Sequence, residues 1–276
     1  MIQPEMIRWT DWGGSGTVSL VGGEGTGNYS VENRRFNRRA RSISAQTVKV
    51  KAPARQLCSS YSRKSLRAVG GAVLHARLDL LTADPTVLGG CIQYIQGEMR
   101  PAVESQPGSL GLSLLASPEL GTAVLESFWA SDHALRAGGK TAATVRGELA
   151  RRAGGSVTVE EYRVAVFERE APLRGGEGVR LTRIEVRPSA VDDVIEAFGD
   201  SAVPLLAEHP GFRSALLFAD PATGQLVSET VWRDPRARAA SPSVAAVIQA
   251  DVLTEAHCQI RGVEDYSLVF SSARSA

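Results

Sequence analysis

MRPAVESQPGSLGLSLLASPELGTAVLESFW at residues 99–129 and AVPLLAEHPGFRSALLFADPATGQLVSETVW at residues 202–232 are the two stretches that decide the fold. They align without a gap at one constant offset, from 99 to 202. The positions they share are mostly turn residues and a strand end, including a Pro-Gly pair, a late turn glycine and the tryptophans Trp129 and Trp232. Residues of this kind set backbone geometry, so the repeat predicts that the fold is a duplication.

Before the shared stretch, each copy begins with the same two elements. Apolar residues predict a strand over 73–81 in copy one and over 179–187 in copy two. Helix-start residues follow, at Asp84-Pro85 and at Pro188-Ser189, and apolar residues then recur at helical spacing on one face. The shared stretch itself adds two strands joined by a short turn, which predicts an antiparallel hairpin.

After the shared stretch, a second helix and a last strand complete each copy. The helix is expected over 132–153 in copy one, with a weak point at Gly138-Gly139. In copy two it is expected between Asp234 and His257, with an interruption near Pro242. The last strands carry VEEY at 159–162 and VEDY at 263–266. Each copy is therefore predicted to be β-α-β-β-α-β, which is the ferredoxin-like order.

A four-stranded sheet with helices on one face leaves its other face bare, and the sheet of a second copy would cover that face. We therefore expect an α+β fold in which two tandem ferredoxin-like units, over residues 71–170 and 179–276, form an intramolecular pseudo-dimeric α+β barrel. Residues 170–178 are rich in Gly, Arg and Pro, which predicts a linker between the units.

Residues 1–70 differ from both copies. They hold 12 of the 31 Lys/Arg residues but 4 of the 30 Asp/Glu residues, so a basic segment precedes an acidic remainder. Glycine runs, an arginine cluster and a Ser-rich tract leave few apolar residues to bury, which predicts a disordered basic arm. A mis-assigned start of the chain is the alternative. Nucleic acid is not the expected partner of this arm.

The whole-chain composition bounds the compartment and the class of protein. Hydrophobic residues make up 43% of the 276 residues, which is ordinary for a protein that buries a core. The absence of a long apolar run predicts no membrane helix, and the N-terminus has no apolar core of signal-peptide type. We expect a reduced, cytoplasmic compartment because the three cysteines have no metal-ligand spacing: Cys58, Cys91 and Cys258.

The recurring motifs resemble those of the antibiotic biosynthesis monooxygenase (ABM) group of the dimeric α+β barrel superfamily. The residues that carry the likeness are the Pro-Gly pairs, the strand ends ESFW at 126–129 and ETVW at 229–232, and the VEEY and VEDY strands. The resemblance implies two sheets packed face to face, here within one chain. It also implies either a cofactor-free oxygenase of aromatic polyketides or a member with another role. Haem degradation is not expected, because the Asn and His of that branch are missing from the matching elements.

The candidate site residues recur in both copies, with one exception. Trp129 and Trp232 end the third strands, where the resemblance places a ring in a cavity between helices and sheet; a packed core aromatic is the alternative. Tyr162 and Tyr266, in the last strands, are candidates for hydrogen bonding a ligand or for packing. His133 has no counterpart and is the one candidate general base, although a histidine at a helix start is commonly exposed.

Two glutamates recur as well, three residues before each tryptophan. The two-residue period of a strand places Glu126 and Glu229 on the sheet face opposite the tryptophans. That face meets the other copy. We expect each carboxylate to pair with an arginine there rather than to act as an acid or a base.

Two functions are left open by these patterns. The first is a cofactor-independent monooxygenase that acts on an aromatic, polyketide-type molecule in an apolar pocket, with no metal and no cofactor. The second is a non-catalytic duplicated barrel that binds a small apolar ligand or serves as a scaffold. Internal pairing of the copies predicts a monomer, or a higher homo-oligomer, and a membrane is not an expected partner.

Overall fold

The computed structural model describes residues 17–19, 28–30, 73–170, 172–243 and 256–273. The chain divides into two compact units, residues 1–60 and 61–276. In the first unit, strands β1 (Thr17–Ser19) and β2 (Asn28–Ser30) form an antiparallel pair. The rest of the predicted disordered arm lies outside the described residues, so its disorder stays a prediction.

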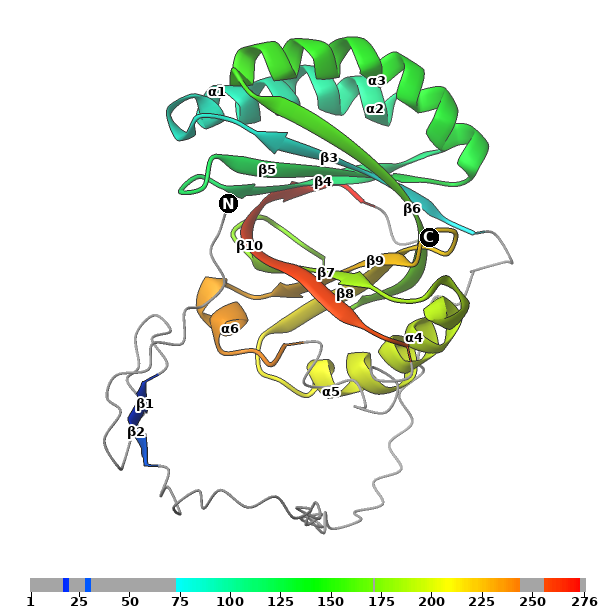
Figure 1. Cartoon of the computed structure of the whole chain (residues 1–276). Helices are drawn as coiled ribbons and strands as arrows, with labels where there is room; N and C mark the ends of the chain where they lie inside the picture. Colours follow the sequence, from blue (N-terminus) through cyan, green and yellow to red (C-terminus); the bar gives the residue numbers. More distant parts are fainter. Residues whose placement is uncertain (1–16, 20–27, 31–72, 171, 244–255, 274–276) are drawn as a thin grey trace, which may run out of the picture. The chain divides into compact units, whose positions relative to one another are not determined.

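The second unit contains the β-α-β-β-α-β order twice (Figure 1). We call residues 75–169 repeat 1 and residues 178–271 repeat 2. Repeat 1 consists of β3 (His75–Thr82), α1 (Pro85–Tyr94), the π-helical turn η2 (Ile95–Met99), α2 (Arg100–Glu104), β4 (Ser109–Ser117), β5 (Thr122–Trp129), α3 (Asp132–Ala153) and β6 (Ser156–Arg169).

Repeat 2 has the same order, and even its π-helical turn falls at the matching place. Its elements are β7 (Gly178–Glu185), the short 3-10 helix η3 (Pro188–Ala190), α4 (Val191–Ala197), the π-helical turn η4 (Phe198–Ala202), α5 (Val203–Ala207), β8 (Phe212–Asp220), β9 (Gln225–Trp232), α6 (Pro235–Ala239) and β10 (Gln259–Ser271). The predicted α+β fold of ferredoxin-like type is confirmed.

The eight strands of the two repeats close into one antiparallel barrel, in the order β10-β4-β5-β3-β6-β8-β9-β7. Closure depends on the long fourth strands. The first half of β6 pairs with β3 of its own repeat, and its second half pairs with β8 of the other. Strand β10 likewise pairs with β7 and then with β4. Each crossing coincides with a bulge, at 164–166 in β6 and at 268–270 in β10.

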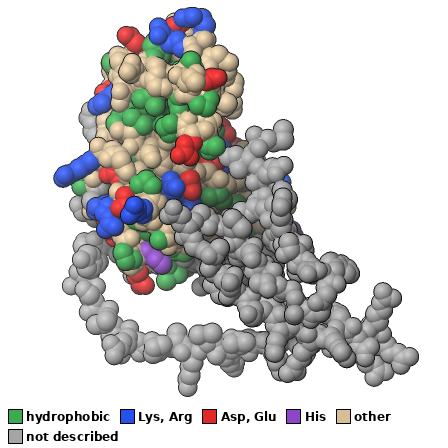
Figure 2. Space-filling model, turned by 90° about the vertical axis from the view of Figure 1, so that its left-hand side faces the viewer, with side chains coloured by type: hydrophobic (Ala, Val, Ile, Leu, Met, Phe, Trp, Pro, Cys, Tyr) green, Lys and Arg blue, Asp and Glu red, His purple; other side chains and the backbone are tan. Residues whose placement is uncertain are grey.

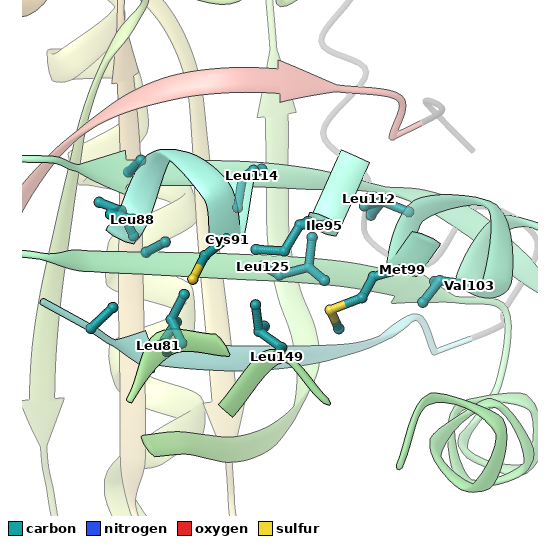
Figure 3. Packing of buried hydrophobic residues seen from close by; sticks show 14 of the residues in the cluster. Leu81, Leu88, Cys91, Ile95, Met99, Val103, Leu112, Leu114, Leu125 and Leu149 are labelled. Atoms are coloured by element: carbon teal, nitrogen blue, oxygen red, sulfur yellow. The ribbon is translucent and has the colours of Figure 1, made fainter. Parts of the chain in front are cut away.

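Three buried cores follow from the alternation of side chains along these strands. One lies between α1–α3 and the sheet of repeat 1 (Figure 3). A second lies between the helices and the sheet of repeat 2. The third fills the barrel and draws on both repeats. In β5, Leu125 and Trp129 face the helices, while Val124 and Phe128 face the barrel. Figure 1 shows the resulting layers, with helices outside and the barrel between them.

The repeated turn glycines have a steric reason. Gly121 has φ +65° and Gly224 has φ +78°, a conformation that favours glycine. A Cβ on Gly121 would also collide with the carbonyl oxygen of Ala83, and one on Gly224 with that of Val186. Each turn is held there by a backbone bond, from Ala83 N to Gly121 O at 2.8 Å and from Val186 N to Gly224 O at 2.9 Å.

The second helices differ between the repeats. In repeat 1, α3 has the predicted bounds and 22 residues; Ser131 Oγ accepts from Ala134 N at its start, and Gly154 ends it at φ +59°. In repeat 2, α6 has five residues and ends before Pro242. The rest of the predicted helix falls mainly on residues 244–255, which are outside the described residues.

The outer surface carries charges of both signs. On the face shown in Figure 2, acidic and basic side chains are interspersed, with apolar side chains between them. Within the described part of the chain, no helix has the length and apolar character needed to cross a membrane.

Candidate functional site

Trp129 belongs to a closed core in repeat 1. Its side chain is fully buried, and its indole N–H donates to Ser127 Oγ on the same strand at 3.0 Å. The ring lies directly against Gly138 of α3, where an added Cβ would collide with the ring atoms. The next glycine, Gly139, leaves the same kind of space for the guanidinium of Arg77. The predicted weak point of the helix is therefore the place where α3 closes onto the sheet.

Trp232 is also fully buried, but its surroundings differ. Its indole N–H donates to Thr230 Oγ1 at 3.1 Å, and its ring meets Phe212 edge-on with centroids 5.7 Å apart. Two residues before Thr230 on the same strand face, Ser228 is fully buried, and its hydroxyl has no hydrogen-bond partner among the residues that the structure describes. Leu125 stands at the matching place in repeat 1. The helix-facing side of β9 thus contains an unpartnered polar group that repeat 1 lacks.

Tyr162 and Tyr266 face the barrel, not the helix side where the tryptophans lie. Tyr162 Oη donates to Glu160 Oε2 at 3.1 Å, and Tyr266 Oη donates to Glu264 Oε2 at 2.8 Å. Arg183 joins the two pairs: its Nη1 lies 2.9 Å from Glu160 Oε2, and its Nε lies 2.6 Å from Glu264 Oε1. The two tyrosines and two glutamates therefore form a cluster around one arginine, which we call the Arg183 cluster.

The Arg183 cluster is poorly suited to acid–base chemistry. Burial, and then the charge of Glu160, raises the pKa of Tyr162 well above its ordinary value. Burial and Glu264 do the same to Tyr266. For Arg183, burial lowers the pKa, but bonds to the two glutamates outweigh it and the net direction is upward. Both phenols stay protonated and donate to carboxylates of their own strands, while Arg183 links the two strands.

The last predicted residue, His133, lies on the first turn of α3 with an exposed side chain. The structure brings it into neither the tryptophan cores nor the barrel. Of the residues with described positions, no group of three His, Cys, Asp or Glu side chains is arranged to hold a metal ion. The predicted set is thus distributed over four separate places in the molecule.

A pair of carboxyl groups occupies the barrel interior. Glu126 is 1% exposed and Glu229 is 3% exposed, and their side chains lie in hydrogen-bonding contact with each other. Elsewhere among the described residues, no donor reaches either oxygen of Glu126 or Oε2 of Glu229. Two ionised carboxylates can only accept, so the contact is a hydrogen bond when one of them carries a proton.

The electrostatics of the pair agree with a shared proton. Burial, and then the charge of Glu229, raises the pKa of Glu126 well above its ordinary value. Burial also raises the pKa of Glu229, although the bond to Glu126 and the charge of Arg169 oppose this. Arg169 acts on both carboxyl groups, in line with the expected arginine partner, and each glutamate also lies in hydrogen-bonding contact with the other.

The family comparison matches the second half of the molecule. The sequence model described as antibiotic biosynthesis monooxygenase matches residues 178–247, which run from β7 past the end of α6. We call this matched segment the ABM domain. This domain includes Phe212, Ser228 and Trp232, so the unpartnered hydroxyl and the aromatic pair lie within the matched residues.

Relatives and solved structures extend the likeness beyond the ABM domain. The uncharacterized protein Rv2558 of Mycobacterium tuberculosis is 28% identical over 205 residues, which are 74% of this chain and 87% of that protein. A second M. tuberculosis protein, Rv2557, is 28% identical over 162 residues, 59% of this chain and 72% of that protein.

Two solved structures share the fold. A candidate monooxygenase from Lactobacillus acidophilus has a TM-score of 0.53 and 12% identity, and the match covers 73% of this chain and 96% of that one. An anthrone oxidase-like protein has a TM-score of 0.51 and 18% identity, covering 73% and 93%. These likenesses establish an ABM-type fold over both repeats.

Two features of this ABM-type barrel were missed by sequence reasoning. The contact between Glu126 and Glu229 had a signal, because the same acid recurs at the matching inward position of each copy. Equivalent positions near the axis of a pseudo-twofold barrel meet each other. The signal for Ser228 was weaker. A serine stands in the third strand of copy two at the position where copy one has Leu125.

Proposed function

We propose that this chain binds a small aromatic or apolar molecule with one polar group, on the helix-facing side of the repeat 2 sheet. The observation that carries the proposal is the hydroxyl of Ser228, which is fully buried and unpartnered on the same strand face as Trp232. A buried hydroxyl without a partner costs about 1–3 kcal/mol. A ligand group that bonds this hydroxyl would offset that cost, while Trp232 and Phe212 supply aromatic surface.

The contrast with repeat 1 supports the choice of repeat 2. In repeat 1, Leu125 replaces the serine, and the ring of Trp129 is pressed onto Gly138 of a 22-residue helix. In repeat 2, the described helix after Trp232 is five residues long. Both Ser228 and Trp232 are buried, so binding requires the helix-facing side of β9 to open.

We further propose that residues 71–170 form a second ABM-type domain whose role is that of a built-in partner subunit. Its sheet edges are completed by strands of repeat 2, and those of repeat 2 by β6. The chain should therefore be a monomer in dilute solution. Sedimentation analysis that returned an obligate dimer at the lowest measurable concentrations would contradict this.

A second candidate function, oxygenation of the bound molecule, is favoured by the location of the ABM domain over the same residues. Anthrone is a suitable probe because a solved neighbour is anthrone oxidase-like. Its oxidation balances without a cofactor: one anthrone and one O₂ give one anthraquinone and one water. The C–H proton of the substrate must be lost in this reaction, and in the probe assay the buffer base takes it.

The test separates binding from catalysis. Equilibrium dialysis with anthraquinone should show saturable binding by the full chain, and Trp232→Phe and Ser228→Ala should weaken it. Trp129→Phe and Ser113→Ala, which alter a matching tryptophan and another buried serine, should leave it unchanged. Equal loss in Trp129→Phe would place the site elsewhere. Oxygen uptake with anthrone above the buffer rate would establish the oxygenase, and binding without uptake would leave a non-catalytic binder.

A further inference from the structure

We propose that Glu126 and Glu229 hold one shared proton at neutral pH, and that this proton joins the two repeats across the barrel interior and is released as the barrel loosens in alkaline solution. The proposal concerns a site that plays no part in the binding proposed for Trp232. It depends on three features of the interior: the mutual contact, the lack of other donors, and the charge nearby.

The positions of the two glutamates bring them together from opposite sheets. Glu126 lies in β5 between Leu78 of β3 and Ser113 of β4. Glu229 lies in β9 between Leu181 of β7 and Leu216 of β8. These flanking side chains are apolar, apart from the Ser113 hydroxyl, which is bonded to Ser271 Oγ of β10 at 2.9 Å. Among the described residues, no donor other than the partner carboxyl group reaches either oxygen of Glu126 or Oε2 of Glu229.

One charged group faces the pair from the strands whose residues are described. Arg169, at the end of β6, acts on both carboxyl groups, while its own Nη1 donates to the backbone oxygen of Ala273 at 2.9 Å. With one shared proton, the pair carries a single negative charge, which Arg169 balances. A second negative charge in the same apolar interior would have no counter-charge and would repel the first.

The two carboxyl groups occupy equivalent positions, so either of them can hold the shared proton. A glutamine at 126 or at 229 keeps a donor of nearly the same shape and leaves one carboxylate to face Arg169.

The sign of the pH effect follows from the direction of the shift. Glu126 has a raised pKa in the folded chain, so between its unfolded and folded pKa values the folded state binds more protons than the unfolded state. Stability is then fully present below the unfolded value and is lost as pH rises through the folded value, by about tenfold in the unfolding equilibrium constant per pH unit for one proton.

The experiment uses the full chain in two measurements. Urea unfolding from about pH 5 to about pH 9 should show the tenfold-per-unit loss over part of that range in the wild type, and a flatter profile in Glu126→Gln. Glu98→Gln, at an exposed position of η2, is the matched control and should keep the wild-type profile. Glu229→Gln should flatten the profile in the same way as Glu126→Gln.

The second measurement does not depend on any variant folding. Infrared spectra of the wild type should show the C=O stretch of one protonated carboxyl at neutral pH, which disappears at alkaline pH together with the loss of stability. A band that persists only in acid, as for exposed carboxyl groups, would overturn the proposal. So would a wild-type stability that does not fall over the alkaline half of the range.

Discussion

Repeat 1 and repeat 2 have superimposable strand orders, turns and π-helical turns, yet the helix sides of their sheets differ. In repeat 1, Gly138-Gly139 lets a continuous α3 lie flat on Trp129 and Arg77. In repeat 2, Ser241-Pro242 occupies the matching positions, and α6 has already ended at Ala239. The difference teaches that the sheet and the turns maintain the fold, whereas the second helix can vary. It covers the sheet in repeat 1 and, as described, has only five residues in repeat 2.

The largest expected effect concerns Arg183, the arginine of repeat 2 that contacts one glutamate from each repeat. Arg183→Leu introduces the residue found at the matching position of repeat 1, Leu80. It leaves Glu160 and Glu264 facing each other without a cation, which should cost about 3 kcal/mol, the lower end for breaking a buried ion pair because the group is partly exposed. Urea unfolding measures this. A cost below that of an ordinary surface pair would show that the Arg183 cluster does not join the repeats.

The next effect tests the cover of repeat 1. Gly138→Ala places a Cβ against the ring of Trp129 and should destabilise the chain by about 1–3 kcal/mol through overpacking. Gly147→Ala is the matched control on the same helix, where a Cβ meets nothing within 4 Å. The control should stabilise the chain by about 0.5–1 kcal/mol, because alanine is the better helix former. If both variants move the unfolding midpoint in the same direction, α3 does not close on Trp129 as described.

A smaller effect of opposite sign is expected in repeat 2. Ser228→Ala removes an unpartnered hydroxyl and should stabilise the ligand-free chain by about 1 kcal/mol. The same variant should bind anthraquinone roughly tenfold less tightly, because the hydrogen bond to the ligand is lost. Thermal unfolding and dialysis on one preparation give both numbers. A destabilised variant would show that the hydroxyl already has a structural partner.

The smallest effects concern the helix caps. Ser131→Ala removes the cap of α3, which is packed along its length, and should lower the global free energy of unfolding by about 1 kcal/mol. Asp234→Ala removes the cap of α6, where Oδ1 accepts from Ala237 N at 2.7 Å. That change should mainly speed amide hydrogen exchange within residues 235–239. Equal global costs would mean that the two helices contribute equally to stability.

Local signals explain what could be predicted from the sequence. The bounds of α3 follow from a capping serine and a terminal glycine, and the start of α1 from Asp84, whose Oδ1 accepts from Thr86 N at 2.8 Å. The two-residue strand period placed Trp129 and Glu126 on opposite faces. Each of these inferences uses residues that are close in the sequence. The constraint on the backbone there is local, so the residue pattern reflects it directly.

What could not be predicted depends on closure between distant strands. The fourth strands, β6 and β10, are 14 and 13 residues long because they cross from one sheet to the other at a bulge. Nothing within either strand indicates the second partner. The meeting of Glu126 with Glu229, and the sharing of Arg183 by two glutamates, likewise arise only when both repeats are in place. Packing or hydrogen bonding was predicted for the two tyrosines, but neither copy alone indicates that Arg183 links their glutamate partners.

Arg183 also shows what covalent linkage of the two repeats permits. In a dimer of identical subunits, any residue near the twofold axis comes with its own copy, and two arginines at such a position would repel. A fused chain is exempt from that rule, so one arginine can serve two glutamates while a leucine fills the equivalent place. The equivalent positions 169 and 273, with Arg169 and Ala273, and 125 and 228, with Leu125 and Ser228, are further cases. Fusion has turned each symmetric position into two independent ones, free to take on separate tasks.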